Sequence, residues 1–278
     1  MKNIFLDENK NDTNVWDMIC EGKTKGCFQI EGYLGKTWCQ KAQPRTIAEL
    51  ADVISIIRPG CLANKVNGKN MAQIYVDGKH ETEEVKSLYK SIDHIIEPTY
   101  GVIVYQEQAM KIAEVMAGFT LEEADSLRKA IGKKQADLMK QVKEKFVTGC
   151  RSNNVPEEKI HEVFGIIEKS NRYSFNKSHA VGYALMAYAS AYRKCNRSIV
   201  FYKHSLRNAK HKIKPDLYKK MLVLSAKSDD IKVFGPTLKH PHETFEIVNN
   251  DLYFGICDIK SIGKAHLDKY VGIMKELL

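Results

Sequence analysis

Apolar residues return every three or four positions from Tyr105 to Cys195, a spacing that predicts a succession of amphipathic helices. Within this stretch Thr120 stands three residues before Glu123, which is the pattern of a capping box and predicts a helix over 121–131. Pro156 suits the first turn of a further helix. A long helix is expected from Ser178 to about Cys195. A chain with this much helical periodicity is expected to be mainly α.

The flanking regions predict shorter elements. Apolar spacing predicts an amphipathic helix over 47–57, which Pro59 and Gly60 terminate. Residues 26–31 read as a short strand or extended segment. Short alternating segments over 231–254 predict a small β element, and residues 259–278 return to a helical pattern.

Composition excludes several classes of protein. Hydrophobic residues make up 44% and charged residues 28% of the chain, close to globular averages, which excludes a wholly disordered chain. No apolar run approaches the ~18 residues of a membrane span. The first residues contain no apolar segment of signal-peptide type, so a cytoplasmic location is expected.

Cysteine and histidine usage argues against a metal site built by this chain. The 7 cysteines are scattered without a C-x-x-C pair, which is typical of reduced thiols and unlike a structural zinc site. The histidines form no H-E-x-x-H group. No metal ligand is therefore predicted.

Positive charge is concentrated in one part of the chain. The formal net charge is +9, yet 13 Lys and Arg residues against a single acid, Asp216, lie between Lys169 and Lys220. A second basic run extends from Arg128 to Lys145. Such concentration is the electrostatic signature of a phosphate-bearing partner such as nucleic acid. A solvated lysine-rich face would give the same pattern, and charge alone leaves both interpretations open.

Residues 173–179, Tyr-Ser-Phe-Asn-Lys-Ser-His, stand directly before the predicted helix at Ser178. The N–H groups and dipole of a helix N-terminus favour an anion, and Lys177, Ser178 and His179 can add donors. The segment could therefore bind a triphosphate or a backbone phosphate. The alternative is that Asn176 or Ser178 only caps the helix while Lys177 is solvated.

A second cluster, residues 127–134, supplies four cations around Gly132. It could form a bent, phosphate-facing loop or a solvated face. No nucleophile with an evident base partner appears, and there is no Walker loop, G-x-G-x-x-G or D-x-D pair. No catalytic residue is predicted in this chain.

Taken in order, six segments resemble the bacterial replicative DNA polymerase III alpha subunit, a C-family polymerase. They are Gly26-Cys-Phe-Gln-Ile-Glu31, Ile57-Arg-Pro-Gly60, Glu97-Pro-Thr-Tyr-Gly101, Tyr105-Gln-Glu-Gln108, Ala124-Asp-Ser-Leu-Arg-Lys-Ala-Ile-Gly-Lys-Lys134 and Tyr173-Ser-Phe-Asn-Lys-Ser-His179. The resemblance runs from about residue 5 to at least 200. It continues more weakly through 253–263, which is similar to the stretch entering the family's helix-hairpin-helix region.

The resemblance implies a fold and a division into parts. The fold class is mainly α, the helical fingers domain of a C-family DNA polymerase, with a small β element and a helix-hairpin-helix-like C-terminal end. Residues 1–14 would be a polar lead-in. Residues 15–220 would form the fingers domain, which binds nucleotide and DNA, and residues 221–278 the small β and helix-hairpin-helix-like segment.

The resemblance also assigns roles to individual residues. The set expected to bind the phosphates of the incoming dNTP is Arg128, Lys129, Lys133, Lys177, Ser178 and His179. The nucleotide pocket would be shaped by Tyr173, Phe175 and Asn176. The set expected either to contact DNA or to be structural is Arg58, Tyr100, Gln106, Gln108, Arg172, Arg193, Lys194, Lys260 and Lys264. Lys129 stands where the family usually has a second arginine, so a bidentate phosphate contact becomes a point charge. Ser261 stands where the family's hairpin usually has a glycine, which weakens that DNA contact.

In this family the palm domain, whose aspartates hold two Mg²⁺ ions, normally precedes this segment. Phosphoryl transfer depends on those ions, so this chain alone is not expected to polymerise DNA. We expect a split polymerase in which a separate palm-bearing chain supplies Mg²⁺, with template-primer DNA, dNTP and other replisome proteins as partners. The location would be the bacterial cytoplasm or a phage-infected bacterial cell. The alternative is a non-catalytic module that binds DNA or nucleotide and interferes with a host replicative polymerase.

Overall fold

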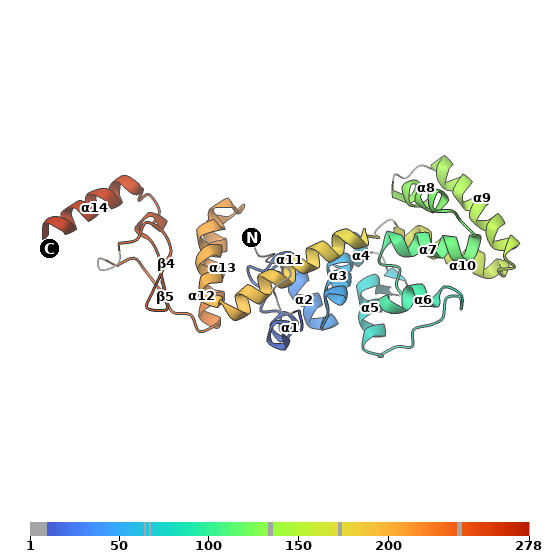
Figure 1. The fold of residues 1–278 in the computed structure, drawn as a ribbon, viewed down its shortest axis with the longest axis horizontal. Coiled ribbons are helices and arrows are strands. Elements are labelled where there is room, and N and C mark those ends of the chain that lie inside the picture. The colour runs from blue at the N-terminus through green and yellow to red at the C-terminus, as the bar shows by residue number, and fades with distance from the viewer. Residues whose placement is uncertain are drawn as a thin grey trace. The chain divides into compact units, whose positions relative to one another are not determined.

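The computed structural model describes residues 10–63, 65–66, 68–132, 136–171, 174–237 and 241–277, and helices dominate them (Figure 1). The mainly α fold predicted from the sequence is confirmed. None of the helices among the described residues combines the length and apolar character that a membrane span requires. All seven cysteines are free thiols.

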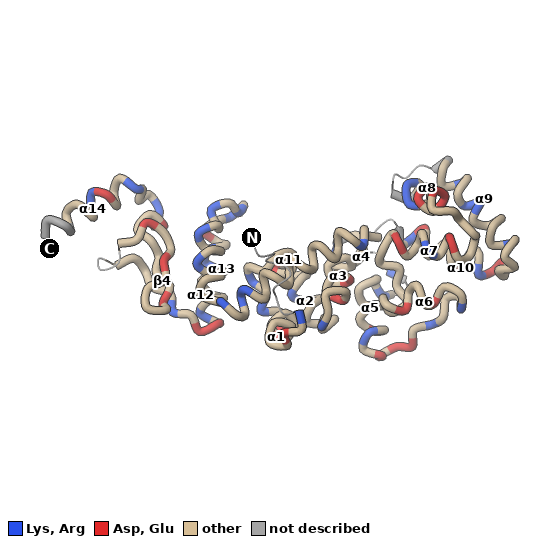
Figure 2. Tube along the Cα trace, in the orientation of Figure 1, with Lys and Arg blue, Asp and Glu red and all other residues tan. Residues whose placement is uncertain are grey.

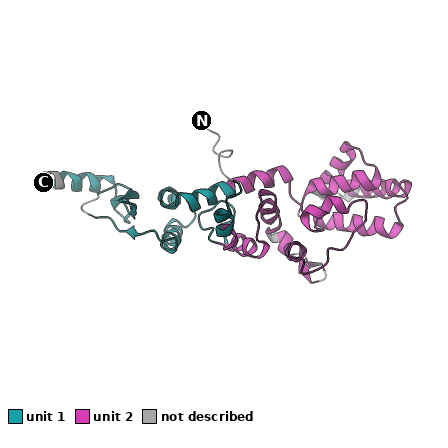
Figure 3. Ribbon diagram, turned by 60° about the horizontal axis from the view of Figure 1, so that its bottom comes forward, with its two compact units in different colours: residues 1–18, 23–32, 187–278 teal, residues 19–22, 33–186 magenta. Residues whose placement is uncertain are grey.

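The chain divides into two compact units (Figure 3). Unit 1 contains residues 1–18, 23–32 and 187–278, and unit 2 contains residues 19–22 and 33–186. The division falls within helix α11 (Lys177–Asn196), whereas the sequence analysis placed a boundary at residue 220. The reason is that residues between 199 and 226, among them Tyr202 and Leu222, share an apolar core with the small sheet that follows them.

In unit 2 the regular elements of the described residues are helices and a two-stranded ribbon. Its elements are α2 (Tyr33–Ala42), α3 (Ile47–Ile56), α4 (Pro59–Ala63), β1 (Lys65–Val66), β2 (Lys69–Asn70), α5 (Met71–Lys79), α6 (Asp93–Ile96), the 3₁₀ turn η1 (Glu97–Thr99), α7 (Gln106–Ala117), α8 (Leu121–Gly132), α9 (Ala136–Ser152), α10 (Glu157–Asn171) and the first half of α11. Strands β1 and β2 pair antiparallel.

Helices α7 to α10 pack around one apolar core. Ile112, Leu127, Phe146 and Phe164 are buried at its centre. The capping box predicted for α8 is present, because the backbone N–H of Thr120 donates to the Glu123 carboxylate at 2.8 Å and that of Glu123 donates to the Thr120 hydroxyl at 3.4 Å. The predicted start of this helix is therefore confirmed.

Helices α7 and α9 approach closely at a glycine. A Cβ atom on Gly149 would lie 2.1 Å from the carbonyl oxygen of Ala117, a separation that real atoms do not adopt. Near the same point the Asn153 side chain donates to the carbonyl of Met116 at 3.0 Å. The absence of a side chain at position 149 sets the distance between these two helices.

Unit 1 combines helices with a three-stranded sheet. Its elements are most of α1 (Thr13–Cys20), the second half of α11, α12 (Ser198–Arg207), η2 (Asn208–His211), α13 (Pro215–Ser228), β3 (Val233–Phe234), β4 (Glu246–Val248), β5 (Asp251–Tyr253), η3 (Ile256–Asp258) and α14 (Lys264–Leu277). The strand order is β3-β5-β4, with β3 parallel and β4 antiparallel to β5. This is the small β element predicted for residues 231–254.

Two local predictions fail. Residues 26–31 form turns rather than a strand, with a positive φ at both Gly26 and Gln29. The basic stretch after α11, for which the sequence analysis predicted no helix, folds into α12 and α13. Tyr202 and Leu206, and likewise Leu222 and Ala226, recur four residues apart and are buried. Exposed apolar residues such as Val200 and Leu224 interrupt this spacing and obscured the helical pattern in the sequence.

Candidate functional site

The N-terminus of α11 is attached to the start of α7 by backbone pairing. The N–H of Phe175 donates to the carbonyl of Val104 and the N–H of Gln106 donates to the carbonyl of Phe175, both at 3.0 Å. The Tyr105-Gln-Glu-Gln108 and Ser174-Phe-Asn-Lys-Ser-His179 motifs, remote in sequence, are thus brought together.

Glu107 supplies the anion at the α11 N-terminus. Both of its carboxylate oxygens accept from the backbone N–H of Lys177, at 3.1 and 3.0 Å, and one accepts from the Asn176 amide at 2.9 Å. The Asn176 side-chain oxygen in turn accepts from the backbone N–H of His179 at 2.9 Å. Asn176 is therefore the helix cap, and contact with a phosphate at this place falls to side chains rather than to these backbone donors.

Cationic and aromatic side chains surround Phe175. The guanidinium of Arg58 lies 4.3 Å from the Phe175 ring centroid, within cation–π range. The ring of His179 lies 5.3 Å from Phe175 and 4.2 Å from Tyr183. The Lys177 ammonium stands 5.6 Å above the Tyr105 ring, and Lys177, Ser178 and His179 are exposed. We call Arg58, Phe175, Lys177, Ser178 and His179 the Phe175 cluster.

A buried carboxylate lies beneath this cluster. Asp52 of α3 is 4% exposed and accepts hydrogen bonds from the Tyr105 hydroxyl at 2.6 Å and the Tyr75 hydroxyl at 3.0 Å. Burial raises the pKa of Asp52 to about 6, although the two hydroxyls and the positive charge of Lys177 act to lower it. Asp52 fixes Tyr105, whose ring supports Lys177.

Replacing Asp52 by Asn is expected to change how stability depends on pH. The folded-state pKa of Asp52 lies above its ordinary value of 3.8, so the native state binds the extra proton and loses stability as pH rises from about 4 to 6. The parent should lose about 3 kcal/mol of unfolding free energy relative to Asp52→Asn over that range. Urea unfolding of both proteins from pH 4 to 7 measures the difference. If the difference in unfolding free energy between the two proteins did not vary with pH, the raised pKa of Asp52 would be contradicted.

Gln108 is a buried structural residue. Its side-chain oxygen accepts from the N–H groups of Val104 and Tyr105, both at 2.9 Å, and its amide donates to the Thr99 hydroxyl at 2.7 Å. These bonds fix the turn before α7, which pairs with Phe175. Gln106 is half-buried at the first position of α7.

The two cations of the α8 motif share one acid. Asp125 pairs with Arg128 and with Lys129, each at 2.7 Å, and these side chains remain partly exposed. Among the described residues no hydrogen bond or ion pair joins them to the Phe175 cluster. A phosphate bound by Arg128 and Lys129 would have to compete with Asp125.

The other expected site residues are distributed over both units. Half-buried Tyr100 donates to Glu49 at 3.4 Å, and Lys260 and Lys264 are exposed. Arg193 is half-buried and donates to the carbonyl of Ala189 at 3.1 Å. The remaining expected residues, Lys133, Arg172 and Tyr173, lie outside the described residues.

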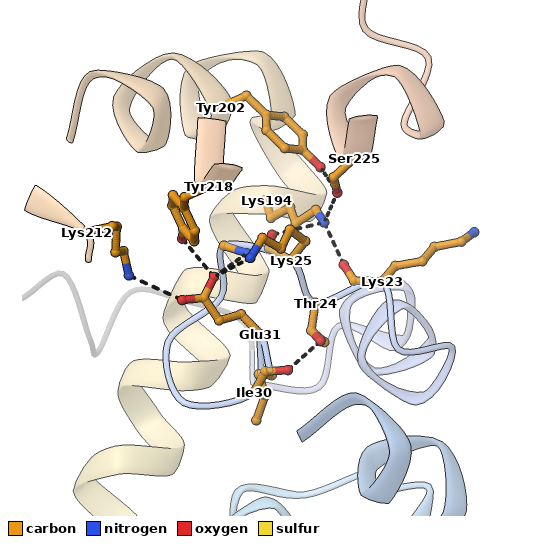
Figure 4. Close-up of polar contacts among 11 residues, drawn as sticks. Lys23, Thr24, Lys25, Ile30, Glu31, Lys194, Tyr202, Lys212, Tyr218 and Ser225 are labelled. Atoms are coloured by element: carbon orange, nitrogen blue, oxygen red, sulfur yellow. Dashed lines mark hydrogen bonds and ion pairs between the residues drawn. The ribbon is translucent and has the colours of Figure 1, made fainter. Parts of the chain in front are cut away.

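Lys194 is structural. It is 1% exposed, and its ammonium donates to the carbonyls of Lys23 at 2.7 Å and Lys25 at 3.3 Å and to the Ser225 hydroxyl at 3.2 Å (Figure 4). Asp229 lies 3.5 Å from it. With its ammonium enclosed by unit 1, Lys194 does not reach a DNA strand at the surface.

The basic stretch is partly neutralised within unit 1. Figure 2 shows Lys and Arg recurring along α12 and α13. The ion pairs are Lys203 and Arg207 with Glu246, Lys212 with Glu31 and Lys219 with Asp258. The effective positive charge of this surface is therefore smaller than the sequence count suggests.

Sequence reasoning missed the acids of the site. Asp52 accepts from the Tyr105 hydroxyl, and Asp125 pairs with two cations of the α8 motif. Glu107, which lies inside the Tyr105-Gln-Glu-Gln108 motif, accepts from the Asn176 amide and the Lys177 backbone N–H. In the described part of the chain, no three His, Cys, Asp or Glu side chains gather as they would around a metal ion.

Comparison with known proteins gives consistent matches. Residues 3–154 match the family model of the bacterial DNA polymerase III alpha subunit finger domain. The DNA polymerase III subunit alpha of Aquifex aeolicus is 37% identical over 261 residues, which are 94% of this chain and 22% of that protein. The Caulobacter vibrioides protein of the same name is 32% identical over 96% of this chain and 22% of its own length. The Thermus aquaticus protein is 31% identical over 95% of this chain and 21% of its own length. The chain spans about a fifth of the length of these relatives.

Proposed function

This chain belongs to the family of bacterial DNA polymerase III alpha subunits and contains its finger domain, and we propose that it acts as the fingers portion of a DNA-directed DNA polymerase. In this role it binds the incoming dNTP and template-primer DNA. Mg²⁺ and the carboxylates that hold it come from a palm-bearing polypeptide, because two-metal phosphoryl transfer requires them.

The Phe175 cluster is the observation that carries this proposal. Arg58 and His179 lie beside the Phe175 ring, and Lys177 lies over the ring of Tyr105. The segments that follow α3, precede α7 and begin α11 meet here although they are far apart in the sequence. Cations beside the half-buried ring of Phe175 suit a ligand that has both phosphates and a planar base. The Lys177 ammonium would contact the triphosphate as a point charge, and Ser178 and His179 would donate further hydrogen bonds.

The α8 cations would take part only after Asp125 releases them. Arg128 has the planar fork that matches a phosphate, whereas Lys129 provides charge alone. Because surface ion pairs contribute only about 0.2–1 kcal/mol, a triphosphate can compete with Asp125 for both side chains.

Titration of Mg²⁺-dNTP into the chain, followed by calorimetry, tests the nucleotide-binding part of the proposal. Lys177→Ala should weaken binding about tenfold, the loss of one charge-assisted contact. Asp125→Asn should strengthen it about two- to fivefold by releasing Arg128 and Lys129. Lys140 of α9 is an exposed lysine outside both clusters, so Lys140→Ala is the matched control and should change nothing. Equal affinities for all four proteins would contradict nucleotide binding at the Phe175 cluster.

A further inference from the structure

Unit 1 contains a groove that the proposed nucleotide site does not use. The hollow has a volume of about 840 Å³ and lies along the C-terminal end of α11 and along α12. Six of the residues that line it are Tyr192, Arg193, Arg197, Phe201, His204 and Lys212. We call it the α11–α12 groove.

Its lining combines cations with aromatic rings. Arg193 and Arg197 stand four residues apart where α11 ends and α12 begins, and Phe201 follows one turn later. Among the described residues that line the groove there is no Asp or Glu. The surface therefore attracts a phosphate-bearing ligand and also offers apolar faces to it.

One wall of the groove is fixed by a glycine. Gly26 has a φ of +84°, and a Cβ atom there would lie 2.9 Å from Cζ of Phe201. The backbone of the 26–31 turn thus rests directly on the Phe201 ring. Phe201 also packs edge-on against Tyr202, with centroids 5.5 Å apart. The aromatic part of the groove is held in place before any ligand binds.

Two acids bond to residues that line the groove. Asp12 accepts from the Asn196 amide at 3.2 Å, and Glu31 contacts Tyr218 and Lys212, with its charge offset. Glu31 accepts from the Tyr218 hydroxyl at 2.7 Å and pairs with Lys25 at 3.4 Å and Lys212 at 3.2 Å (Figure 4). Burial acts to raise the pKa of Glu31, but the Tyr218 hydrogen bond and the two lysines outweigh it and lower the pKa. Glu31 is ionised near neutral pH, and two ammonium groups compensate its single charge.

We propose that the α11–α12 groove binds single-stranded DNA. Arg193 and Arg197 contact the backbone phosphates, and Phe201 and Tyr192 provide faces on which bases stack. A duplex is a poorer match, because its paired bases are already stacked and cannot lie on these rings. The inference gives a location to the DNA binding in the proposed function, yet it rests on different residues from the Phe175 cluster.

Fluorescence anisotropy of a labelled oligo(dT) with the full chain tests this assignment. The parent should bind with an affinity that falls steeply as salt rises. The double variant Arg193→Ala/Arg197→Ala should bind at least tenfold more weakly, and its log–log salt dependence should be shallower by about 1.4, since each single-strand phosphate contact contributes about 0.7. Phe201→Ala should weaken binding without changing that slope.

Controls separate the groove from general charge and from the nucleotide site. Lys227 is exposed on α13 and does not line the groove, so Lys227→Ala should leave affinity unchanged. An equal loss with Lys227→Ala, or duplex binding as tight as oligo(dT) binding, would overturn the proposal. Lys177→Ala should keep oligo(dT) affinity while losing dNTP affinity. The groove variants should lose oligo(dT) affinity while keeping dNTP affinity, so the two binding proposals can be contradicted independently. Melting temperatures establish that every variant is folded.

Discussion

Replacing Lys177 by alanine is expected to reduce primer extension about a hundredfold when the chain is combined with a palm-bearing polypeptide of the same family. Lys177 is an exposed cation at a helix N-terminus that Asn176 caps and whose first N–H donates to Glu107, so the variant loses the side-chain charge and keeps the backbone arrangement. Charge that develops on the transferring phosphoryl group depends on such positioned cations for its stabilisation. The loss should appear in kcat/KM for every dNTP alike.

The assay contains Mg²⁺, the four dNTPs and a labelled primer-template, with each polypeptide tested alone and together. Arg128→Ala should also lose activity, Lys177→Arg should recover part of it and Lys140→Ala should retain it. Extension by this chain alone would contradict the proposal that Mg²⁺ is held by a palm-bearing polypeptide. DNA binding without extension in any mixture would favour the non-catalytic module.

Gly149→Ala is expected to destabilise unit 2 by about 3 kcal/mol or more, at the upper end of overpacking effects. The added methyl group would lie 2.1 Å from the Ala117 carbonyl oxygen and 2.9 Å from its carbonyl carbon, and both atoms belong to the backbone of α7. A side chain could rotate away, whereas here α7 and α9 must separate and open the core around Phe146.

Gly165 provides a matched control, because it also lies within a helix, α10, and a Cβ atom there would meet nothing within 4 Å. Gly165→Ala should stabilise the protein by up to about 1 kcal/mol through helix propensity alone. Chemical unfolding of the two variants and the parent measures both effects. If Gly149→Ala proved as stable as Gly165→Ala, the close approach of α7 and α9 would be wrong.

Local signals in the sequence predicted a large part of this fold. The Thr120–Glu123 capping box located the start of α8, and alternating residues located the small sheet. Helices α12 and α13 were missed because few apolar residues face their small core, while exposed apolar residues such as Val200 and Leu224 obscure the helical spacing. The spacing of apolar residues predicts a helix only where the buried face of that helix is wide.

The sequence allowed candidate residues within one motif to be named, but it did not reveal which residues from other segments pack against them. Phe175 and Lys177 stood out in the sequence, but their neighbour Arg58 joins them only through tertiary packing. The burial of Lys194 was also beyond sequence reasoning, since a lysine in a basic run looks like its solvated neighbours. Counting charges in the sequence shows that cations are present, but it does not show which carboxylates they pair with.

The carboxylate of Glu107 occupies the place at the α11 N-terminus where an anion would otherwise bind. Sulfate, orthophosphate or pyrophosphate would meet backbone donors that are already hydrogen-bonded. Displacing the Glu107 carboxylate would exchange one set of hydrogen bonds for another, with little net change in binding free energy. A nucleotide bound as proposed would be retained through the sum of its contacts with side chains and rings, and no single anionic group would be sufficient. Inorganic anions would then compete weakly with the nucleotide, and a small phosphate product would dissociate readily.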